Sequence, residues 1–402
     1  MPEPVPSFGL GRLPRITFGA GVFEQVPQIV ARHGTRAFLV TGGRSFNDSP
    51  RRAQLEAGLA DAGVTLVGAT SVSGEPGPAD VEDPVAAYRG QGIEVVIGIG
   101  GGAAVDTAKA IAGLLPVETE LIDHLEGVGR GVPYPGGALP VVAVPTTAGT
   151  GSEATRNAVI TRRGPDGYKR SFRDESMVPA DAVVDPDLLA TAPRSLIASN
   201  GLDALTQLLE AMTSQRATPF TDALARDGLA ACRDGLPAWH ADPAGVDAPA
   251  ARSRMAYAAL LSGVCLANAG LGAVHGFASP LGARLPIPHG MACGAVLWQT
   301  VRTNIIALTE RVPDSPALPK YAEAGRILAS LPSTIRDGAA RVALVDVLHD
   351  LVKRLEVPPL SAFEMTAEHI PVIVADSPGS SMRTNPVALT DEELTSILQQ
   401  AL

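Results

Sequence analysis

Short apolar runs alternate with longer amphipathic stretches through the first half of the chain. The apolar runs are rich in β-branched residues and predict buried strands at 37–41, 65–68, 95–99, 141–144 and 182–184. The stretches between them predict helices at 50–62, 81–91 and 104–114. This alternation is typical of a mostly parallel sheet with helices on both faces. We therefore expect a doubly wound α/β nucleotide-binding domain over residues 1–190.

The pattern changes after about residue 190, where long stretches rich in alanine and leucine dominate. Their periodicity predicts helices at 195–214, 219–236, 250–269, 289–308, 317–331 and 344–355. The segment 234–249 is rich in Asp, Pro and Gly and predicts an exposed loop. Residues 191–402 are therefore expected to form a second domain that is all-α.

Composition limits the kinds of partner and the compartment. A chain of 402 residues suits two ordinary domains. The net charge of −10 comes from 42 acidic and 32 basic residues without a Lys/Arg block, so nucleic acid and anionic membranes are not expected partners. Three cysteines without paired spacing favour a reducing cytoplasm. No secretory signal or membrane-spanning run is evident, and we expect a cytoplasmic protein with a small-molecule substrate.

Two loops that follow predicted strands have the composition of phosphate-binding turns. The first contains Gly100, Gly101 and Gly102, whose small size lets backbone amides approach a pyrophosphate at the N-terminus of the next helix. The second, 145–153 (PTTAGTGSE), offers four hydroxyl groups and two glycines after the strand 141–144. Either loop alone also fits a tight turn or a helix cap. Two such loops at the ends of two strands favour dinucleotide binding.

A third strand end bears on which dinucleotide binds. An acidic side chain there would hydrogen-bond the adenosine ribose of NAD and repel the 2′-phosphate of NADP. The chain instead has the sequence GGRS at 42–45, and a guanidinium beside a hydroxyl and free amides suits a phosphate. The sequence favours NADP over NAD, and use of both stays open.

Four polar residues of the second half have the spacing of a metal site. Asp203 and Gln207 are four positions apart, which places them on one face of a predicted helix. His275 and His289 are fourteen positions apart in a Gly/Pro-rich apolar segment. Two imidazoles and a carboxylate suit Fe(II) or Zn(II), with Gln207 as a weak oxygen ligand or water in its place. Spacing alone also allows buried structural histidines beside an ordinary amphipathic helix.

These loops, followed by DALTQ (203–207) and VHGFASPLGARLPIPHG (274–290), resemble the iron-containing alcohol dehydrogenase family. The resemblance extends from ITFGAG (16–21) to SMRTNP (381–386) and so covers nearly the whole chain. It implies an N-terminal dinucleotide-binding α/β domain, a helical C-terminal domain and an oxidoreductase activity. It also implies a homodimer, for which the short strand near 15–18 is a candidate interface.

The resemblance also implies site residues, position by position. Asp203, His275 and His289 fall on metal-ligand positions. Gln207 stands where the family usually has a histidine ligand, and Ser279 stands where it usually has a second histidine four residues after the first. The metal-ligand candidates are Asp203, His275, His289 and Gln207. The resemblance puts Gly100, Gly101, Gly102, Asp106, Thr146, Thr147 and Thr150 at the cofactor. The third strand end adds Gly42, Gly43 and Ser45, and Lys169 completes the set of cofactor-binding candidates.

Two mechanisms stay open, with His275, His289, Ser279 and Gln207 as catalytic candidates. In the first, a metal ion polarises the oxygen of an aldehyde, ketone or keto acid during hydride transfer, and Ser279, Gln207, a cofactor hydroxyl or water relays the proton. In the second, which resembles metal-independent maleylacetate reductases, His275 or His289 donates the proton directly. Gln207 and Ser279 then hydrogen-bond the carbonyl oxygen. The two-histidine, one-carboxylate set favours the first mechanism.

Two other functions also fit the pattern. A dehydroquinate-synthase-like lyase would share the architecture, but the helical half is poor in the lysines that such a site needs. A nucleotide-binding protein without turnover is supported only by the two altered histidine positions. Steady oxidation of NAD(P)H by an aldehyde would exclude binding alone, and phosphate release without net cofactor change would favour the lyase. A basic residue lining the pocket would predict an acidic substrate, with Arg284, Lys169, Arg170 and Arg173 as candidates.

Overall fold

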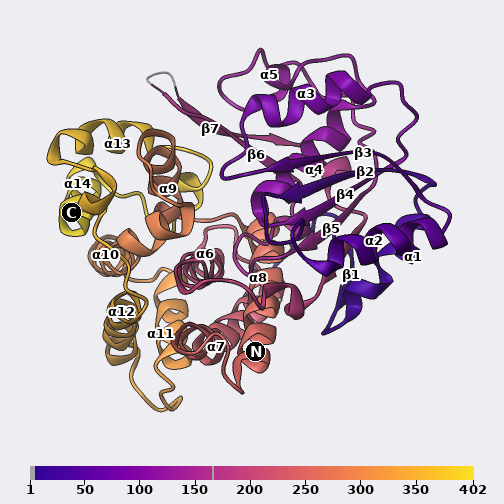
Figure 1. Cartoon of the computed structure of the whole chain (residues 1–402). Helices are drawn as coiled ribbons and strands as arrows, with labels where there is room; N and C mark the ends of the chain where they lie inside the picture. The colour runs from indigo at the N-terminus through magenta and orange to yellow at the C-terminus, as the bar shows by residue number, and fades with distance from the viewer. Residues whose placement is uncertain (1–4, 165–166) are drawn as a thin grey trace. The chain divides into compact units, whose positions relative to one another are not determined.

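The chain, described here by a computed structural model over residues 5–164 and 167–402, divides into two compact units (Figure 1). The first unit is Gly11–Thr191. The second unit is Ala192–Leu402 together with the described part of the first ten residues. Each unit has its own internal packing, and each is described separately below.

The first unit is built on six parallel strands. They are β1 (Arg15–Phe18), β2 (Arg36–Gly42), β3 (Thr65–Val72), β4 (Val95–Gly100), β5 (Val141–Pro145) and β8 (Asp181–Val184). Their order across the sheet is β1-β8-β5-β4-β2-β3, and every neighbouring pair is parallel. The central strand β4 is buried at every position, as expected for a strand covered on both faces. The carboxyl ends of the neighbours β2, β4 and β5 therefore lie along one edge of the sheet.

Helices cover both faces of this sheet. They are α1 (Val26–Ala31), α2 (Pro50–Asp61), α3 (Pro78–Tyr88) and α4 (Gly102–Leu114). Ala37 and Leu39 of β2 belong to the core beneath α1 and α2, whereas Phe38 and Val40 belong to the core beneath α3 and α4 (Figure 1). Alternate residues of one strand enter two different cores because successive side chains point to opposite faces. This arrangement confirms the predicted doubly wound α/β class.

Smaller elements complete the first unit. The strands β6 (Asn157–Arg162) and β7 (Tyr168–Arg173) form a separate antiparallel pair that the sequence pattern did not predict. Three basic residues in β7 (YKRSFR) hide it from a search for apolar runs. The remaining elements are α5 (Leu121–His124) and short 3-10 helices at Val22–Gln25, Ser152–Ala154, Glu175–Met177 and Pro186–Leu189.

The second unit is helical, as predicted. Its α-helices are α6 (Arg194–Thr213), α7 (Pro219–Ala241), α8 (Ala248–Ala269), α9 (Ala273–Arg284), α10 (His289–Arg311), α11 (Ala317–Leu328), α12 (Asp337–Arg354), α13 (Ile370–Asp376) and α14 (Asp391–Ala401). Short 3-10 helices lie at Leu360–Phe363, Ala367–His369 and Met382–Thr384. Within the described ranges, no individual helix has the length and apolar character to cross a membrane. The pair α8 and α9 meets that test only when taken together, and it is bent by 101°.

The helix α6 lies at the centre of this unit, where it packs against α7, α8 and α10. All of its residues from Gly201 to Thr213 are buried. The buried set includes the polar residues Asp203, Gln207 and Glu210. Because buried polar groups need hydrogen-bond partners, this face of α6 must be matched by polar groups on its neighbours.

The predicted loop at 234–249 is wrong over its first part. The helix α7 continues through this segment to Ala241. Leu236 and Trp239 are buried there, and their packing outweighs the helix-weakening effect of Gly235 and Pro237. Tertiary burial therefore decides the end of α7 against the local composition.

Candidate functional site

In the first unit, the glycine-rich turn after β4 packs against the threonine-rich loop after β5. A Cβ atom on Gly102 would lie 2.6 Å from Thr150 Cγ2, so only glycine permits this approach. A Cβ atom on Gly101 would lie 3.2 Å from Thr147 Cγ2. Gly101 is also the N-cap of α4, a helix of 13 residues. The two loops therefore meet at the N-terminus of α4, where the first backbone amides of the helix have no intrahelical partner. Such a position is suitable for binding a pyrophosphate.

The end of β2 joins the same edge of the sheet. The amide of Thr146 donates a 2.8 Å hydrogen bond to Gly100 O. A Cβ atom on Gly100 would lie 2.9 Å from Gly42 N, so the ends of β2 and β4 are in close backbone contact. Asn47 Nδ2 donates to Gly42 O at 3.1 Å and to Gly43 O at 3.3 Å, which holds the turn after β2. The predicted residues of three separate loops thus lie together.

Other cofactor candidates differ in their surroundings. Arg44 and Ser45 are exposed just beyond the turn after β2. Lys169 lies on β7, and its Nζ forms a 2.7 Å ion pair with Glu75 Oε2. The lysine ammonium is therefore engaged by a carboxylate of its own unit.

Asp106 acts as an internal partner within α4 and its neighbours. Its Oδ2 accepts a 2.9 Å hydrogen bond from Val159 N, and its Oδ1 accepts one from Ser152 Oγ. The same Oδ1 lies 2.9 Å from Nζ of Lys109, whose side chain is fully buried. Burial lowers the pKa of Lys109 from its ordinary value, although the nearby Asp106 acts in the opposite direction. Asp106 thus ties the segment after β5 to the helix that starts at the glycine turn.

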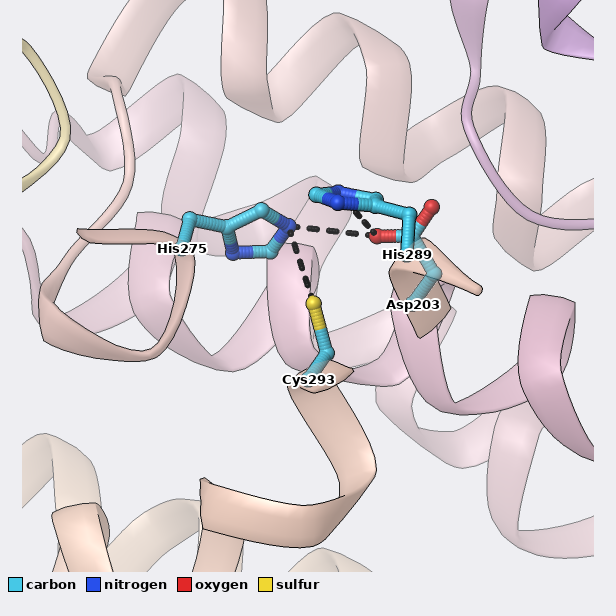
Figure 2. Close-up of side chains that lie close together, drawn as sticks. All are labelled: Asp203, His275, His289 and Cys293. Atoms are coloured by element: carbon cyan, nitrogen blue, oxygen red, sulfur yellow. Dashed lines mark hydrogen bonds and ion pairs between the residues drawn. The ribbon is translucent and has the colours of Figure 1, made fainter. Parts of the chain in front are cut away.

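In the second unit, four side chains with metal-binding chemistry point toward one another (Figure 2). They are Asp203 of α6, His275 of α9, and His289 and Cys293 of α10. One ligand atom of each lies within 4.8 Å of the other three. Asp203 Oδ1 is 3.1 Å from His275 Nε2 and 3.8 Å from His289 Nε2. Cys293 Sγ is 3.8 Å from His275 Nε2.

Close packing of α10 on α6 brings this cluster together. The helix α10 begins at His289, and a Cβ atom on the next residue, Gly290, would lie 1.9 Å from Ser199 O of α6. Only glycine therefore lets α10 start against the backbone of α6. Asp203 follows Ser199 by one turn of α6, and Cys293 follows His289 by one turn of α10. Both side chains consequently face the contact between the two helices.

Glu210 sets the orientation of His275. Its Oε2 accepts a 2.6 Å hydrogen bond from His275 Nδ1, and its Oε1 accepts a 2.7 Å bond from Val274 N. A Cβ atom on Gly272 would lie 2.8 Å from this Oε1, so the glycine makes room for the carboxylate. Because an ionised carboxylate only accepts, Nδ1 carries the proton and Nε2 faces Asp203. A carboxylate on the outer ring nitrogen is the usual partner of a metal-binding histidine.

Gln207 lies one turn after Asp203 on the same helix. Its Nε2 donates a 3.0 Å hydrogen bond to Asp203 Oδ1, and its Oε1 accepts a 2.8 Å bond from Ser262 Oγ of α8. The amide oxygen therefore faces Ser262, and the side of the amide that faces Asp203 carries protons. The ligand role expected of Gln207 requires this amide to turn over.

The remaining candidates are engaged elsewhere or exposed. The hydroxyl of Ser279 donates to His275 O at 3.4 Å, within the helix α9. Arg170 is exposed on β7. Ion pairs join Arg284 to Asp376 and Arg173 to Glu126.

Burial and mutual attraction determine the charge of the cluster. Burial alone would raise the pKa of Asp203, but the charge of His289 and the hydrogen bonds from its neighbours lower it below its ordinary value. Burial acts to lower the pKa of His275, yet its contact with the sulfur of Cys293 and its hydrogen bonds to the flanking carboxylates hold that pKa well above its ordinary value. Burial raises the pKa of the Cys293 thiol. The arrangement therefore favours positive charge at its centre.

The positions of these groups fit a divalent metal ion. Tetrahedral zinc with bonds of about 2.0–2.1 Å to nitrogen and oxygen separates its ligand atoms by roughly 3.3–3.4 Å. The separations of Asp203 Oδ1 from the two histidine nitrogens are 3.1 and 3.8 Å. Both lie within about 0.5 Å of that value, so small side-chain movements suffice. A cation placed between these atoms would replace a proton on His275 Nε2, because it would bind the same Asp203 oxygen that accepts the hydrogen bond from that proton.

Sequence reasoning missed two members of this group, Glu210 and Cys293. Glu210 lies seven residues after Asp203 and three after Gln207, which is the spacing of one helix face. Cys293 lies four residues after His289, and the same rule applies once α10 is known to begin at that histidine. Helical spacing from the chosen candidates would have indicated both residues.

Comparison with known proteins places the chain in a family. Residues 14–186 match the model for iron-containing alcohol dehydrogenase, and residues 197–402 match the model for the C-terminal part of the Fe-containing alcohol dehydrogenase family. The chain is 30% identical over 393 residues to the NAD-dependent methanol dehydrogenase of Bacillus methanolicus, covering 97% of this chain and 98% of that one. It is 31% identical over 392 residues to alcohol dehydrogenase 4 of Saccharomyces cerevisiae, covering 96% of each.

Solved structures agree with the sequence matches. The sulfoacetaldehyde reductase from Bifidobacterium kashiwanohense, solved in complex with NAD+, superposes with a TM-score of 0.84 at 28% identity, covering 98% of each chain. The two family models together span most of the residues of both units. The resemblance inferred from the motifs is thereby confirmed, and so is the enzyme class that it implies. The chain belongs to the iron-containing alcohol dehydrogenase family and is an oxidoreductase.

Proposed function

We propose that the chain is an NAD(P)-dependent alcohol dehydrogenase and carbonyl reductase assisted by a divalent metal ion. Hydride moves between the nicotinamide and the carbonyl carbon of an aldehyde, ketone or keto acid. The NAD dependence of the methanol dehydrogenase relative and the NAD+ complex of the solved reductase support the cofactor class. The convergence of Asp203, His275 and His289 on one point is the observation that carries the proposal.

These three residues would hold Zn(II) or Fe(II). When bound, the ion polarises the carbonyl oxygen of the substrate and stabilises the negative charge that develops on it. Gln207 fixes the Asp203 carboxylate, and Glu210 fixes the His275 ring, so both act as positioning residues. The side chains of Asp203 and His275 are 3% and 6% exposed, whereas that of His289 is 25% exposed. The substrate oxygen would therefore arrive from the side of His289.

The metal-independent alternative asks a histidine to give a proton directly to the substrate. The ring nitrogens of His275 lie 2.6 and 3.1 Å from the carboxylates of Glu210 and Asp203. A proton held between buried carboxylates is poorly placed for transfer to a substrate. This geometry argues against His275 as the direct donor, and the metal-independent alternative then depends on His289. In the metal-assisted mechanism that we propose, Ser279 or water is the proton relay once the hydroxyl of Ser279 leaves His275 O.

For the cofactor, we infer that the pyrophosphate binds at the glycine turn before α4 and the ribose and nicotinamide bind near the threonine loop. Exposed Arg44 and Ser45 after β2 favour binding of the 2′-phosphate of NADPH. Replacing Arg44 with alanine is expected to raise KM for NADPH by about tenfold, since a hydrogen bond to a charged group contributes about 1.5–3 kcal/mol. KM for NADH serves as the internal control and should stay within about twofold. Equal changes for both cofactors would contradict this assignment.

The assembly and compartment are also proposals. The strand β1 is an edge strand of the sheet, and Ile16 and Phe18 on it are 41% and 37% exposed. We infer a homodimer that uses this edge, because a partner strand would cover both residues. A monomeric mass in light scattering at micromolar concentration would contradict it. Three free, buried cysteines suit a cytoplasmic location.

The proposed function is tested by metal content and turnover together. Elemental analysis of the purified protein should find zinc or iron near one equivalent per chain. NADPH and NADH oxidation is then followed over a panel of aldehydes and keto acids, before and after chelation. Activity that disappears on chelation and returns with metal supports the proposal. Undiminished activity in metal-free protein would contradict the metal-assisted mechanism, and phosphate release without net cofactor change would indicate a lyase.

A further inference from the structure

Cys293 is the fourth side chain of the cluster, and the proposed mechanism gives it no role. It is fully buried on α10, and its Sγ lies 3.8 Å from His275 Nε2. The same sulfur lies within 4.8 Å of the ligand atoms of Asp203 and His289 (Figure 2). A buried thiol inside a ring of metal-binding groups is a different environment from that of an ordinary core cysteine.

We propose that the Cys293 thiolate is the fourth protein ligand of the metal ion, an inference that rests on the proposed metal site. Its position in the helix supports this assignment. Cys293 and His289 lie one turn apart on α10, so both can reach a single ion from one helix face. Asp203 of α6 and His275 of α9 then reach that ion from two other helices.

The distances agree with this donor set. A tetrahedral ion with a sulfur bond of about 2.3 Å and a nitrogen bond of about 2.0–2.1 Å places the two ligand atoms roughly 3.6 Å apart. The observed separation of Cys293 Sγ and His275 Nε2 is 3.8 Å. The amide of Gln207 is the competing candidate, but its oxygen faces Ser262 at 2.8 Å. The thiol of Cys293 is therefore better placed than the amide oxygen of Gln207 to act as the fourth ligand.

The chemistry of sulfur sets the expected metal. A thiolate is a soft ligand that selects zinc over the harder oxygen-preferring ions, and Zn(II) commonly binds mixed Cys, His and carboxylate sets. Binding replaces the thiol proton with the metal ion, and that proton is released to solvent. We therefore infer a zinc-type site that these residues would build from one sulfur, two nitrogen and one oxygen donor.

Cobalt substitution tests the proposal without measuring turnover. The full-length protein is freed of metal by chelation and titrated with Co(II), whose visible ligand-field bands report binding. A near-ultraviolet thiolate-to-cobalt charge-transfer band reports sulfur ligation. The wild-type protein should show both signals, and Cys293→Ser should keep the visible bands, lose the charge-transfer band and bind Co(II) at least tenfold more weakly. The tenfold figure is the lower end of the loss typical of residues that only support a ligand.

Cys265→Ser is the matched control, since Cys265 is also buried but lies on α8, where its Sγ donates to Thr221 O. It should keep both signals. Visible bands without a charge-transfer band in the wild-type protein would overturn the role of Cys293 and leave the metal site standing. Absence of any Co(II) or Zn(II) binding would overturn the proposed metal site itself. If Cys293→Ser fails to fold, X-ray absorption of the zinc-loaded wild type decides, because a sulfur shell at about 2.3 Å supports the proposal and its absence refutes it.

Discussion

Replacing Glu210 with glutamine keeps the size of the side chain and removes its charge. In the wild type, the two carboxylate oxygens accept from His275 Nδ1 at 2.6 Å and from Val274 N at 2.7 Å. A glutamine has one acceptor oxygen and one donor amide, so it can accept a hydrogen bond from only one of these two donors. If its oxygen stays on Val274 N, its amide faces His275 Nδ1. The histidine must then move its proton to Nε2, the atom that would bind the metal.

The size of this effect follows from the wrong tautomer. Loss of a supporting partner of a metal-binding histidine weakens metal affinity by about 10–100-fold, which is roughly 1.4–2.7 kcal/mol. Glu210 is buried and its bond to the ring is short, so we expect a value toward the upper end. The free energy of unfolding of the metal-free protein should fall by about 1.5–3 kcal/mol as well, because the buried imidazole loses its hydrogen bond to a charged acceptor.

The assay is a competition between the protein and a coloured chelator for Zn(II) at fixed pH. The matched control is Glu323→Gln, the same chemical change at a partly exposed glutamate that pairs with Arg226. This control should leave zinc affinity within twofold of wild type. Equal zinc affinity for Glu210→Gln and wild type would refute the argument that Glu210 orients the ligand ring.

Three further substitutions test other parts of the structure. Gly290→Ala should lower the free energy of unfolding by about 2 kcal/mol in urea denaturation, because its Cβ would lie 1.9 Å from a carbonyl oxygen of α6. Gly338→Ala is the control and should be neutral or slightly stabilising, because its Cβ would have nothing within 4 Å. Burial raises the pKa of Glu153 from its ordinary value of 4.5 to about 7 in the folded protein. The stability that this group contributes is therefore fully present below the ordinary pKa and is lost as the pH rises through the folded pKa. Glu153→Gln should remove this fall in the free energy of unfolding, measured by urea denaturation across the same pH range. A pH profile equal to that of the wild type would contradict the prediction. In a Cys293→Ala background, Gln207→His should raise the Co(II) affinity about tenfold, because it returns a strong donor one turn from Asp203. The affinity is measured by titration, and no increase would place position 207 out of reach of the ion.

The dinucleotide half was predictable because its signals are local. A run such as VVIGIG is apolar at nearly every position, which only a strand covered on both faces tolerates. The carboxyl ends of parallel strands share one sheet edge, so Gly100 and Thr146 could be placed together from chain order alone. The observed hydrogen bond between them follows from that rule.

The metal half was less predictable because its geometry depends on contacts between helices. The helix α9 carries His275 but includes Pro280 in its interior, so local signals argue against a helix there. Buried Phe277 and Leu281 stabilise it through packing that appears only in the folded unit. The start of α10 at His289 likewise depends on the approach of Gly290 to α6. Spacing therefore named the ligand candidates but could not place the groups that orient them.

The change from histidine to Gln207 takes on a different meaning once the helices are placed. Taken alone, an amide at a ligand position indicates a weakened metal site. In the folded unit, the amide instead holds Asp203 by a 3.0 Å hydrogen bond, while a thiol on α10 stands within 4.8 Å of every other ligand atom. A strong donor missing from α6 is thus matched by one present on α10. If Cys293 binds the ion, the site has exchanged one ligand for another, and its affinity and choice of metal follow from sulfur instead of from a third imidazole.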